Sequence, residues 1–266
     1  PWDIMMWCFY FSHGWLGEPD WAPAMKPVQM LQQEAAVVVA FGGNGQTCEN
    51  PFAKVRTGRL IPWHMKRIGE LARFVKRRHT LCQDAVTIPQ VAVLHSEHHV
   101  RATPNGKNLM WNIDVTPVQG AVFSLLECHY GVDILDEWAL LPRLSDFPVV
   151  VAPEQDAMSE AMVQALKEYV KAGGHLLVSG AKAFDRFGGK FLGVNTGKMV
   201  DKAIYHVPAE DGTVPVFSEP WRLVRLAGAR SLGSLGTTPL AGERMLPHPA
   251  ATLNRVGKGA VACIPG

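Results

Sequence analysis

The chain has 266 residues, of which 47% are hydrophobic and 19% charged, and its formal net charge is +2. This composition is ordinary for a globular protein long enough for two domains, and it excludes a disordered chain. The near-neutral charge gives no electrostatic case for nucleic acid or an acidic membrane, because such binding needs a concentrated basic patch. No apolar run reaches the ~20 residues that a membrane span needs. The five cysteines show neither zinc spacing nor a disulfide framework, so we expect no metal and no cofactor.

The first ninety or so residues carry the same pattern twice: a strand, a long loop and an amphipathic helix. The two copies are a strand within 3–11, a loop over 12–25 and a helix between Pro27 and Gly42-Gly43, then a strand at 45–49, a loop over 50–62 and a helix at 63–78. In the second helix we expect Met65, Ile68, Ala72 and Val75 to face inward. Alternating strands and helices are typical of a (β/α)8 barrel, which two copies cannot close. We therefore expect a further N-terminal portion.

A second domain begins after a short polar connection at 83–89. Its clearest segment is a strand at 149–151, a helix capped by Ser159 and stopped by Gly173-Gly174, and a returning strand at 175–179. This is a right-handed crossover of a parallel sheet, which predicts a doubly wound α/β domain. Beyond residue 204 short apolar runs between glycines and prolines predict β-rich structure. The expected domains are 1–88 (end of a barrel), 89–204 (doubly wound) and 205–266 (a β-rich extension, apparently truncated).

Several segments resemble the C-terminal half of bacterial glycoside hydrolases of the α-L-fucosidase and family 42 β-galactosidase type. They are PWDIMMWCF at the start, KPVQMLQQEAAVVVAFGGNGQ, VAVLHSE, and DFPVVVAPEQDAMSEAMVQALKEYVKAGGHLLVSG. In those enzymes a catalytic (β/α)8 barrel precedes a β-galactosidase trimerisation domain with a flavodoxin-like, class I glutamine amidotransferase-like fold. The resemblance implies that this chain carries strands seven and eight of the barrel followed by the accessory domain, and that the protein is a homo-oligomer. It also implies catalytic carboxylates on earlier strands, so the catalytic residues stay unassigned here.

Aromatic side chains near the presumed barrel mouth are the best candidates for binding a carbohydrate substrate. Sugar rings present apolar C–H faces that stack on indole, and Trp7, Trp15 and Trp21 fall on or just after a barrel strand. Trp7 fits barrel packing equally well. His13 and Gln46 are candidate partners for sugar hydroxyls.

Three carboxylates share this region. Glu49 would end a barrel strand, where this architecture places its active sites, and we expect it to hydrogen-bond substrate rather than to act in catalysis. Glu18 and Asp20 lie beside prolines in a loop, and the expectation for both is a solvated acid.

Two further groups of residues are candidate sites. His95, Glu97, His98 and His99 are dense in potential ligands, but they follow a strand into a loop and lack the H-E-x-x-H spacing, so a metal site is disfavoured. An active amidotransferase-like domain needs a cysteine at a sharp strand-to-helix turn, and neither turn here has one. We expect Cys128 to be a buried structural thiol rather than a nucleophile.

The resemblance therefore implies part of an O-glycosyl hydrolase acting on a fucoside or galactoside, with an oligomerisation domain and with no activity in this part alone. The alternative is a non-catalytic assembly or carbohydrate-binding module. An amidotransferase-like or peptidase-like enzyme is disfavoured by the missing cysteine.

Overall fold

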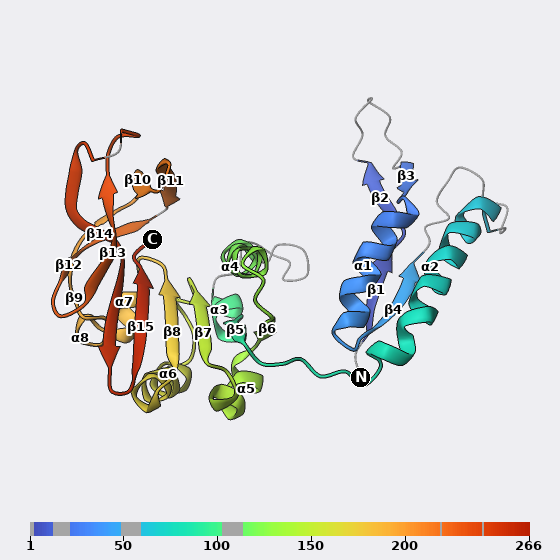
Figure 1. Cartoon of the computed structure of the whole chain (residues 1–266), viewed down its shortest axis with the longest axis horizontal. Coiled ribbons are helices and arrows are strands. Elements are labelled where there is room, and N and C mark those ends of the chain that lie inside the picture. Colours follow the sequence, from blue (N-terminus) through green and yellow to red (C-terminus); the bar gives the residue numbers. More distant parts are fainter. Residues whose placement is uncertain (1–2, 13–21, 49–59, 103–113, 219, 241) are drawn as a thin grey trace. The chain divides into compact units, whose positions relative to one another are not determined.

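The computed structural model describes residues 3–12, 22–48, 60–102, 114–218, 220–240 and 242–266 (Figure 1). The chain divides into two compact units, Pro1–Thr87 and Ile88–Gly266, here called the N-terminal unit and the C-terminal unit. Each has its own hydrophobic core. No helix in the described ranges combines the length and the apolar character that crossing a membrane requires.

The N-terminal unit contains two parallel strands and two helices, together with a short antiparallel pair. β1 and β4 pair in parallel with Asp3 opposite Asn44 and Trp7 opposite Cys48. Its elements are β1 (Asp3–Trp7), β2 (Phe9–Ser12), β3 (Ala22–Met25), α1 (Val28–Ala40), β4 (Asn44–Cys48) and α2 (Pro62–Cys82). Two parallel strands, each followed by a helix, thus lie in a unit separate from the larger sheet.

Local sequence explains the two helices of this unit. Pro27 precedes α1 with φ −59°, and Gly42, at φ +70°, adopts the left-handed conformation just after it. In α2 the residues on the core side are His64, Ile68, Leu71 and Val75, at spacings of four, three and four, whereas Ala72 is exposed. The expected inward position of Ala72 is therefore wrong, because the buried stripe is centred one residue earlier on the helix surface.

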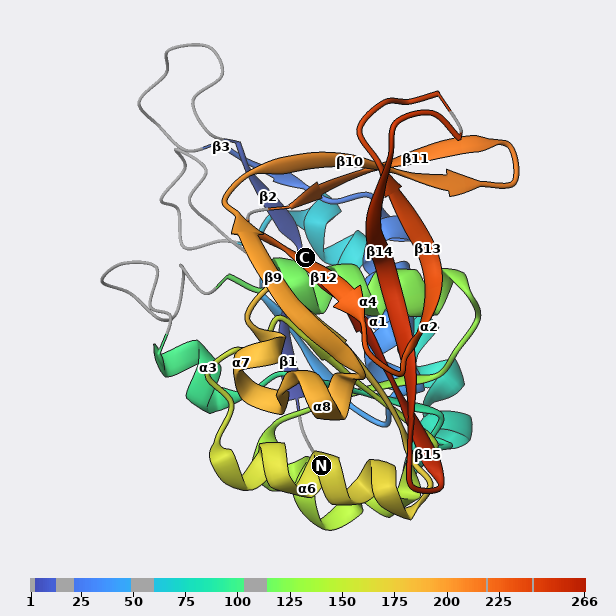
Figure 2. The same cartoon turned by 90° about the vertical axis from the view of Figure 1, so that its left-hand side faces the viewer.

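The C-terminal unit is built on one nine-stranded sheet with the order β11-β10-β13-β14-β15-β8-β7-β5-β6, and β9 and β12 form a separate pair. The strands from β15 to β6 run parallel and those from β11 to β15 antiparallel. Figure 2 shows the long strand β14 running beside β13 and β15. The elements are β5 (Val91–Leu94), α3 (Glu97–Ala102), α4 (Thr116–Glu127), β6 (Val132–Leu135), α5 (Glu137–Leu140), the 3-10 helix η1 (Leu141–Asp146), β7 (Val149–Pro153), α6 (Glu160–Ala172), β8 (His175–Ser179), α7 (Ala183–Phe187), α8 (Gly189–Leu192), β9 (Val194–Val200), β10 (Ala203–Ala209), β11 (Gly212–Ser218), β12 (Trp221–Leu226), β13 (Arg230–Gly236), β14 (Met245–Val256) and β15 (Gly259–Ile264).

The crossover from β7 through α6 to β8 forms as its sequence predicts. The Ser159 hydroxyl accepts a hydrogen bond of 3.1 Å from the Met162 amide and caps α6. Gly173 ends the helix at φ +131°. A Cβ on Gly174 would lie 2.1 Å from the Tyr169 ring, so the second glycine is required for close packing.

The two faces of the parallel sheet are buried by different helices. Val150, Leu176 and Val261 project to one face and pack with α6 and α8. Val91, Val93 and Val151 project to the other face and pack with Val118 of α4. The mixed α/β class is thereby confirmed.

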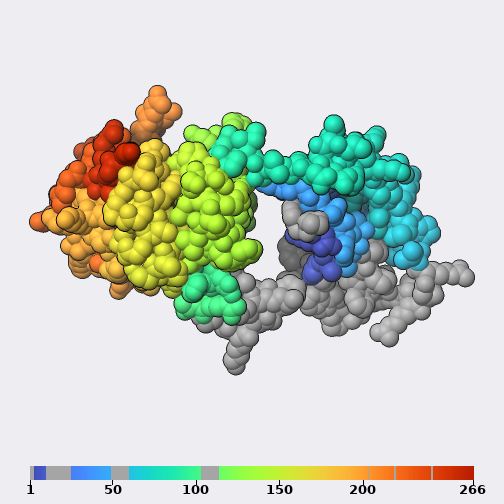
Figure 3. Space-filling model, turned by 90° about the horizontal axis from the view of Figure 1, so that it is seen from below, coloured from blue at the N-terminus to red at the C-terminus, as the bar shows by residue number. Residues whose placement is uncertain are grey.

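The β-rich C-terminal strands are continuous with the α/β part. β15 pairs in parallel with β8, from Ala260 opposite His175 to Ile264 opposite Ser179. The last described strand therefore joins the sheet whose crossover begins more than a hundred residues earlier, and the β-rich residues 205–266 belong to the same compact unit as that crossover. In the space-filling view these residues and the crossover make one continuous body (Figure 3).

Candidate functional site

The first candidate site is the carboxyl end of β1 and β4. The two strands are parallel, so Trp7 and Cys48 end them at the same edge. The indole of Trp7 is half-buried and stacks on Phe9 with ring centroids 5.5 Å apart. An aromatic face at the end of a parallel strand is suited to stacking on a sugar ring.

One face of this two-stranded sheet is exposed. Side chains alternate along a strand, so Asp3, Met5 and Trp7 share a face with Gln46, which lies opposite Met5. Met5 is 56% exposed, whereas Met6, on the other face, is buried in the core with the helices. The structure thus brings Trp7 and Gln46 to the same face, which is the face not covered by α1 and α2.

Asp3 is a residue of this face that sequence reasoning missed. The Gln46 amide nitrogen donates a hydrogen bond of 2.6 Å to the Asp3 carboxylate. The alternation of Asp3, Met5 and Trp7 along one strand was the available signal, but the partner lies 43 residues away. Of the remaining sequence candidates, His13, Trp15, Trp21 and Glu49, like Glu18 and Asp20, lie outside the described residues.

The second candidate site is the carboxyl edge of the parallel sheet in the C-terminal unit. β5 lies between β6 and β7, so the chain leaves β5 in one direction and returns on its other side. Such a switch in strand order opens a crevice at the carboxyl ends of the strands, where α/β proteins bind ligands. The residues at this edge are His95 and Ser96 after β5, and Glu154, Gln155 and Asp156 after β7.

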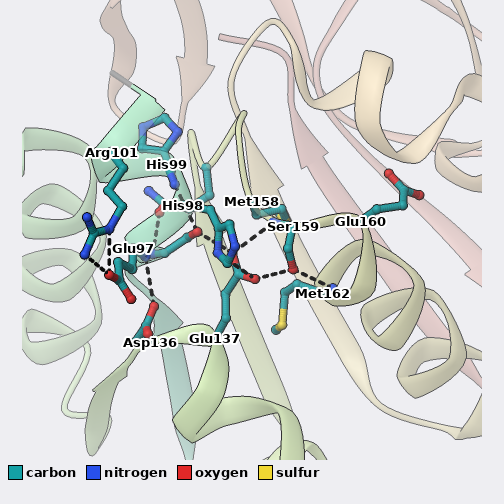
Figure 4. Close-up of polar contacts among 12 residues, drawn as sticks. Glu97, His98, His99, Arg101, Asp136, Glu137, Met158, Ser159, Glu160 and Met162 are labelled. Atoms are coloured by element: carbon teal, nitrogen blue, oxygen red, sulfur yellow. Dashed lines mark hydrogen bonds and ion pairs between the residues drawn. The ribbon is translucent and has the colours of Figure 1, made fainter. Parts of the chain in front are cut away.

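A buried carboxylate joins three segments at this edge (Figure 4). Glu137, at the start of α5, is 4% exposed and accepts hydrogen bonds from the hydroxyls of Ser96 and Ser159 and from the Ser159 amide at 3.0 Å. Ser96 in turn donates its amide to Gln155 at 2.8 Å. The carboxylate therefore fastens the loops after β5 and β7 to the start of α6. Both of its oxygens already accept hydrogen bonds from Ser96 or Ser159.

The histidine-rich segment does not converge on one point (Figure 4). Glu97 pairs with Arg101 at 2.7 Å, while the exposed His98 lies 3.5 Å from Glu137. The Nδ1 atom of His99 accepts a hydrogen bond of 3.3 Å from the Ala157 amide. Within the described ranges no three of the His, Cys, Asp and Glu side chains are placed to hold a metal ion.

Two acids and one histidine at this edge have perturbed pKa values. Burial raises the pKa of Asp156, although Lys182, 3.8 Å away, opposes the shift. Burial, and then repulsion by Asp156 and Asp114, raises the pKa of Glu154. Burial lowers the pKa of His99, which fits a neutral ring that accepts a hydrogen bond at Nδ1. The enclosed space beside Asp156 measures only about 10 Å³, enough for one water molecule at most.

The turn after β7 holds a non-glycine residue in the left-handed backbone conformation, and this residue is not a cysteine. Glu154 lies there at φ +53°. Cys263 is buried in the sheet, and burial raises the pKa of its thiol to about 12. Cys128 is exposed, so its expected burial is wrong: the helix α4 ends at Glu127, and Cys128 is the C-cap residue just beyond it. Neither thiol stands at a described strand-to-helix turn.

Comparison with solved structures finds the same fold in glycoside hydrolases. A β-galactosidase from Rahnella sp. R3 superimposes with a TM-score of 0.71 over 93% of this chain at 17% identity. A family 42 β-galactosidase from G. stearothermophilus, solved as a catalytic mutant, has a TM-score of 0.68 over 93% of this chain at 15% identity. For α-L-fucosidase isoenzyme 2 from Paenibacillus thiaminolyticus the TM-score is 0.67 over 98% of this chain at 20% identity. The chain has the fold of the C-terminal part of these enzymes.

The match covers nearly all of this chain but only 40%, 39% and 40%, respectively, of those three chains. No protein-family profile matches the sequence, and no curated protein matches it significantly. At these identities the likeness establishes the fold alone.

Proposed function

We propose that the chain is the C-terminal part of a glycoside hydrolase that cleaves O-glycosidic bonds in fucoside- or galactoside-type substrates. The observation that carries the proposal is the parallel pair β1 and β4, each strand followed by a helix, in a unit distinct from the nine-stranded sheet. It is supported by galactosidases and a fucosidase that match 93% to 98% of this chain at TM-scores of 0.67 to 0.71.

In this proposal β1 and β4 are strands seven and eight of a (β/α)8 barrel, and the face bearing Trp7 and Gln46 lines its interior. A barrel buries one strand face against its helices and turns the other inward, which accounts for the buried Met6 and the exposed Met5. The two free strand edges are then completed by the other six strands of the barrel.

The chemical role of this part is to bind and orient the sugar. Glycoside hydrolysis needs two carboxyl groups, one to protonate the leaving oxygen and one to attack or to activate water. We place both on earlier strands. Trp7 supplies a stacking surface and Gln46, held by Asp3, an amide for sugar hydroxyls; His13, Trp15, Trp21 and Glu49 are assigned the same role from sequence. The 266-residue chain alone is then inactive.

The C-terminal unit serves oligomerisation in this proposal. Trp138 of α5 is 76% exposed, Ile134 of the edge strand β6 is 52% exposed, and Phe123 and Leu126 of α4 are 54% and 48% exposed. Exposed large apolar side chains and an exposed edge strand are both features of protein interfaces. Light scattering tests this: Trp138→Lys should lower the molar mass of the full-length protein to that of a monomer, and a wild-type monomer would remove the role.

The deciding experiment is an assay of the full-length protein on 4-nitrophenyl α-L-fucoside, β-D-galactoside and β-D-glucoside. We expect turnover of a fucoside or galactoside and none by the 266-residue chain. A full-length protein that binds sugars without turning over any of them would instead support the non-catalytic carbohydrate-binding module.

A further inference from the structure

A groove crosses one face of the sheet in the C-terminal unit, away from both sites described above. It has a volume of about 710 Å³ and lies over the strands β7, β8, β15, β14 and β13. This volume is within the range of ligand-binding pockets, about 300–1,000 Å³. The helices α6 and α8 pack on the opposite face of β8 and β15.

The strand register explains why the groove is hollow. Residues opposite one another project to the same face, so Leu177, Ala262 and Leu253 form one row across β8, β15 and β14. His175, Ala260 and Arg255 form the row beside it. Within the groove, β15 contributes only the methyl groups of Ala260 and Ala262 to this face, so the floor is apolar and low in its middle.

The charged side chains that line the groove are all basic. Arg230 stands opposite Leu253, Arg255 opposite Ala260, and Lys258 lies in the turn before β15. None of these three makes a hydrogen bond or ion pair through its side chain to a residue that the structure describes, and no acidic residue lines the groove. Cations gathered beside an apolar floor without carboxylate partners complement an anionic ligand.

The spacing of the sheet indicates the shape of that ligand. α4 lies over β5 and β7 on this same face. A position over β8 and β15 is two strands further on, roughly 10 Å away at ~4.8 Å per strand. Packed helices lie ~8–10 Å apart. The groove is therefore at the right distance from α4 to hold one further helix packed beside it on the same face of the sheet. The five residues of β8 and six of β15 span ~20 Å, the length of about twelve helical residues.

We propose that this groove binds an acidic amphipathic helix of about three turns supplied by another protein. The apolar stripe of the helix would lie on Leu177, Ala262 and Leu253, and its carboxylates would face Arg230, Arg255 and Lys258. This recognition mode places a helix in a groove through side chains spaced three and four residues apart.

Fluorescence anisotropy with the folded 266-residue chain tests the proposal. The probe is a labelled, hydrocarbon-stapled fourteen-residue peptide with leucines at i, i+3, i+4 and i+7 flanked by glutamates, and the control peptide has lysines in place of the glutamates. The staple is needed because so short a helix is marginal in water. We expect the acidic peptide to bind at least about tenfold more tightly than the basic one, with a difference that shrinks as salt rises.

Variants locate the binding. The double variant Arg230→Glu, Arg255→Glu should weaken binding of the acidic peptide by about tenfold or more. Ala262→Trp leaves the charge unchanged but fills the floor of the groove, and it should block binding of the peptide. The matched reversal of two exposed cations outside the groove, Lys198→Glu with Arg225→Glu, should leave binding unchanged. Equal affinity for both peptides, no binding of the acidic peptide to the folded chain, or equal losses in the two double reversals would overturn the proposal. Self-association of the chain that Arg230→Glu, Arg255→Glu abolishes would also overturn it, in favour of a contact between copies.

Discussion

The side-chain amide of Gln46 and the carboxylate of Asp3 meet at 2.6 Å across β1 and β4, on the face that the helices leave open. In water such a bond contributes little, about 0.5–1 kcal/mol, but a bond to a charged group shielded from water contributes about 1.5–3 kcal/mol. If this face lines a barrel, the strength of the pair depends on strands beyond this chain.

A double-mutant cycle measures that dependence. Asp3→Ala, Gln46→Ala and the double variant should give a coupling free energy of unfolding below about 1 kcal/mol in the 266-residue chain and roughly 2 kcal/mol in the full-length protein. Urea unfolding of the four proteins in each length provides the values. Equal coupling in both lengths would mean that the face stays in water.

Trp7→Ala should reduce kcat/KM of the full-length enzyme on an aryl glycoside by about tenfold or more, because a stacking aromatic interaction contributes ~1–2 kcal/mol. Its Tm should fall by only a few degrees. Trp63→Ala is the matched control, since that indole is 52% exposed, stacks on Arg67 and belongs to α2 rather than to the strand face that carries Trp7. Parallel losses of activity and stability in Trp7→Ala would show that Trp7 only packs.

Glu137→Gln should destabilise the C-terminal unit by about 2–4 kcal/mol and lower its Tm by roughly 5–15 °C. The amide would turn an NH₂ group toward the Ser96 or Ser159 hydroxyl, which now donates to the carboxylate. Glu160→Gln, in the exposed first turn of α6, should change stability by less than about 0.5 kcal/mol. Differential scanning calorimetry distinguishes the two, and similar Tm values would refute the fastening role of Glu137.

His99 predicts a loss of stability toward acid. Its pKa is lowered by burial from 6.5, so the folded state binds fewer protons than the unfolded state, and stability present above pH 6.5 is lost as the pH falls below it. His99→Asn keeps an acceptor for the Ala157 amide but does not titrate. Between pH 7 and pH 5 its Tm should fall about 1–2 °C less than that of the wild type, a small effect because the ring is partly solvated. The exposed His175, changed to Gln, is the control; an unaltered slope in His99→Asn would contradict the assignment.

Local signals were sufficient for the crossover but not for contacts between distant segments. The Ser159 cap and the Gly173 stop depend on a few neighbouring residues, and both form as predicted. The pairing of β15 with β8 joins residues about 85 apart, and the Asp3–Gln46 bond joins residues 43 apart. Neither leaves a trace in local composition. The inward face of α2 was misjudged at Ala72 because apolar character alone does not choose between adjacent stripes on a helix.

The candidate residues divide in the same way. Trp7 and Gln46 were predicted from their place in the barrel segments and from side-chain chemistry, and the parallel register places them on one face. The role of Glu137 was not foreseen. In the sequence, an acid two residues after a strand is typical of a solvated residue at the start of a helix, and only the fold brings the hydroxyls of Ser96 and Ser159 to its carboxylate. Burial decides such roles, and burial here is set by three separate segments.

An experimental structure of the full-length protein tests the central claim most directly, through the two strand edges that β1 and β4 leave open among the described residues. We predict that each free edge pairs with a further parallel strand in a closed eight-stranded barrel, with Trp7 at its carboxyl mouth. Free edges that remain in solvent, or that pair with antiparallel strands, would contradict the assignment of these ninety residues to a sugar-cleaving barrel.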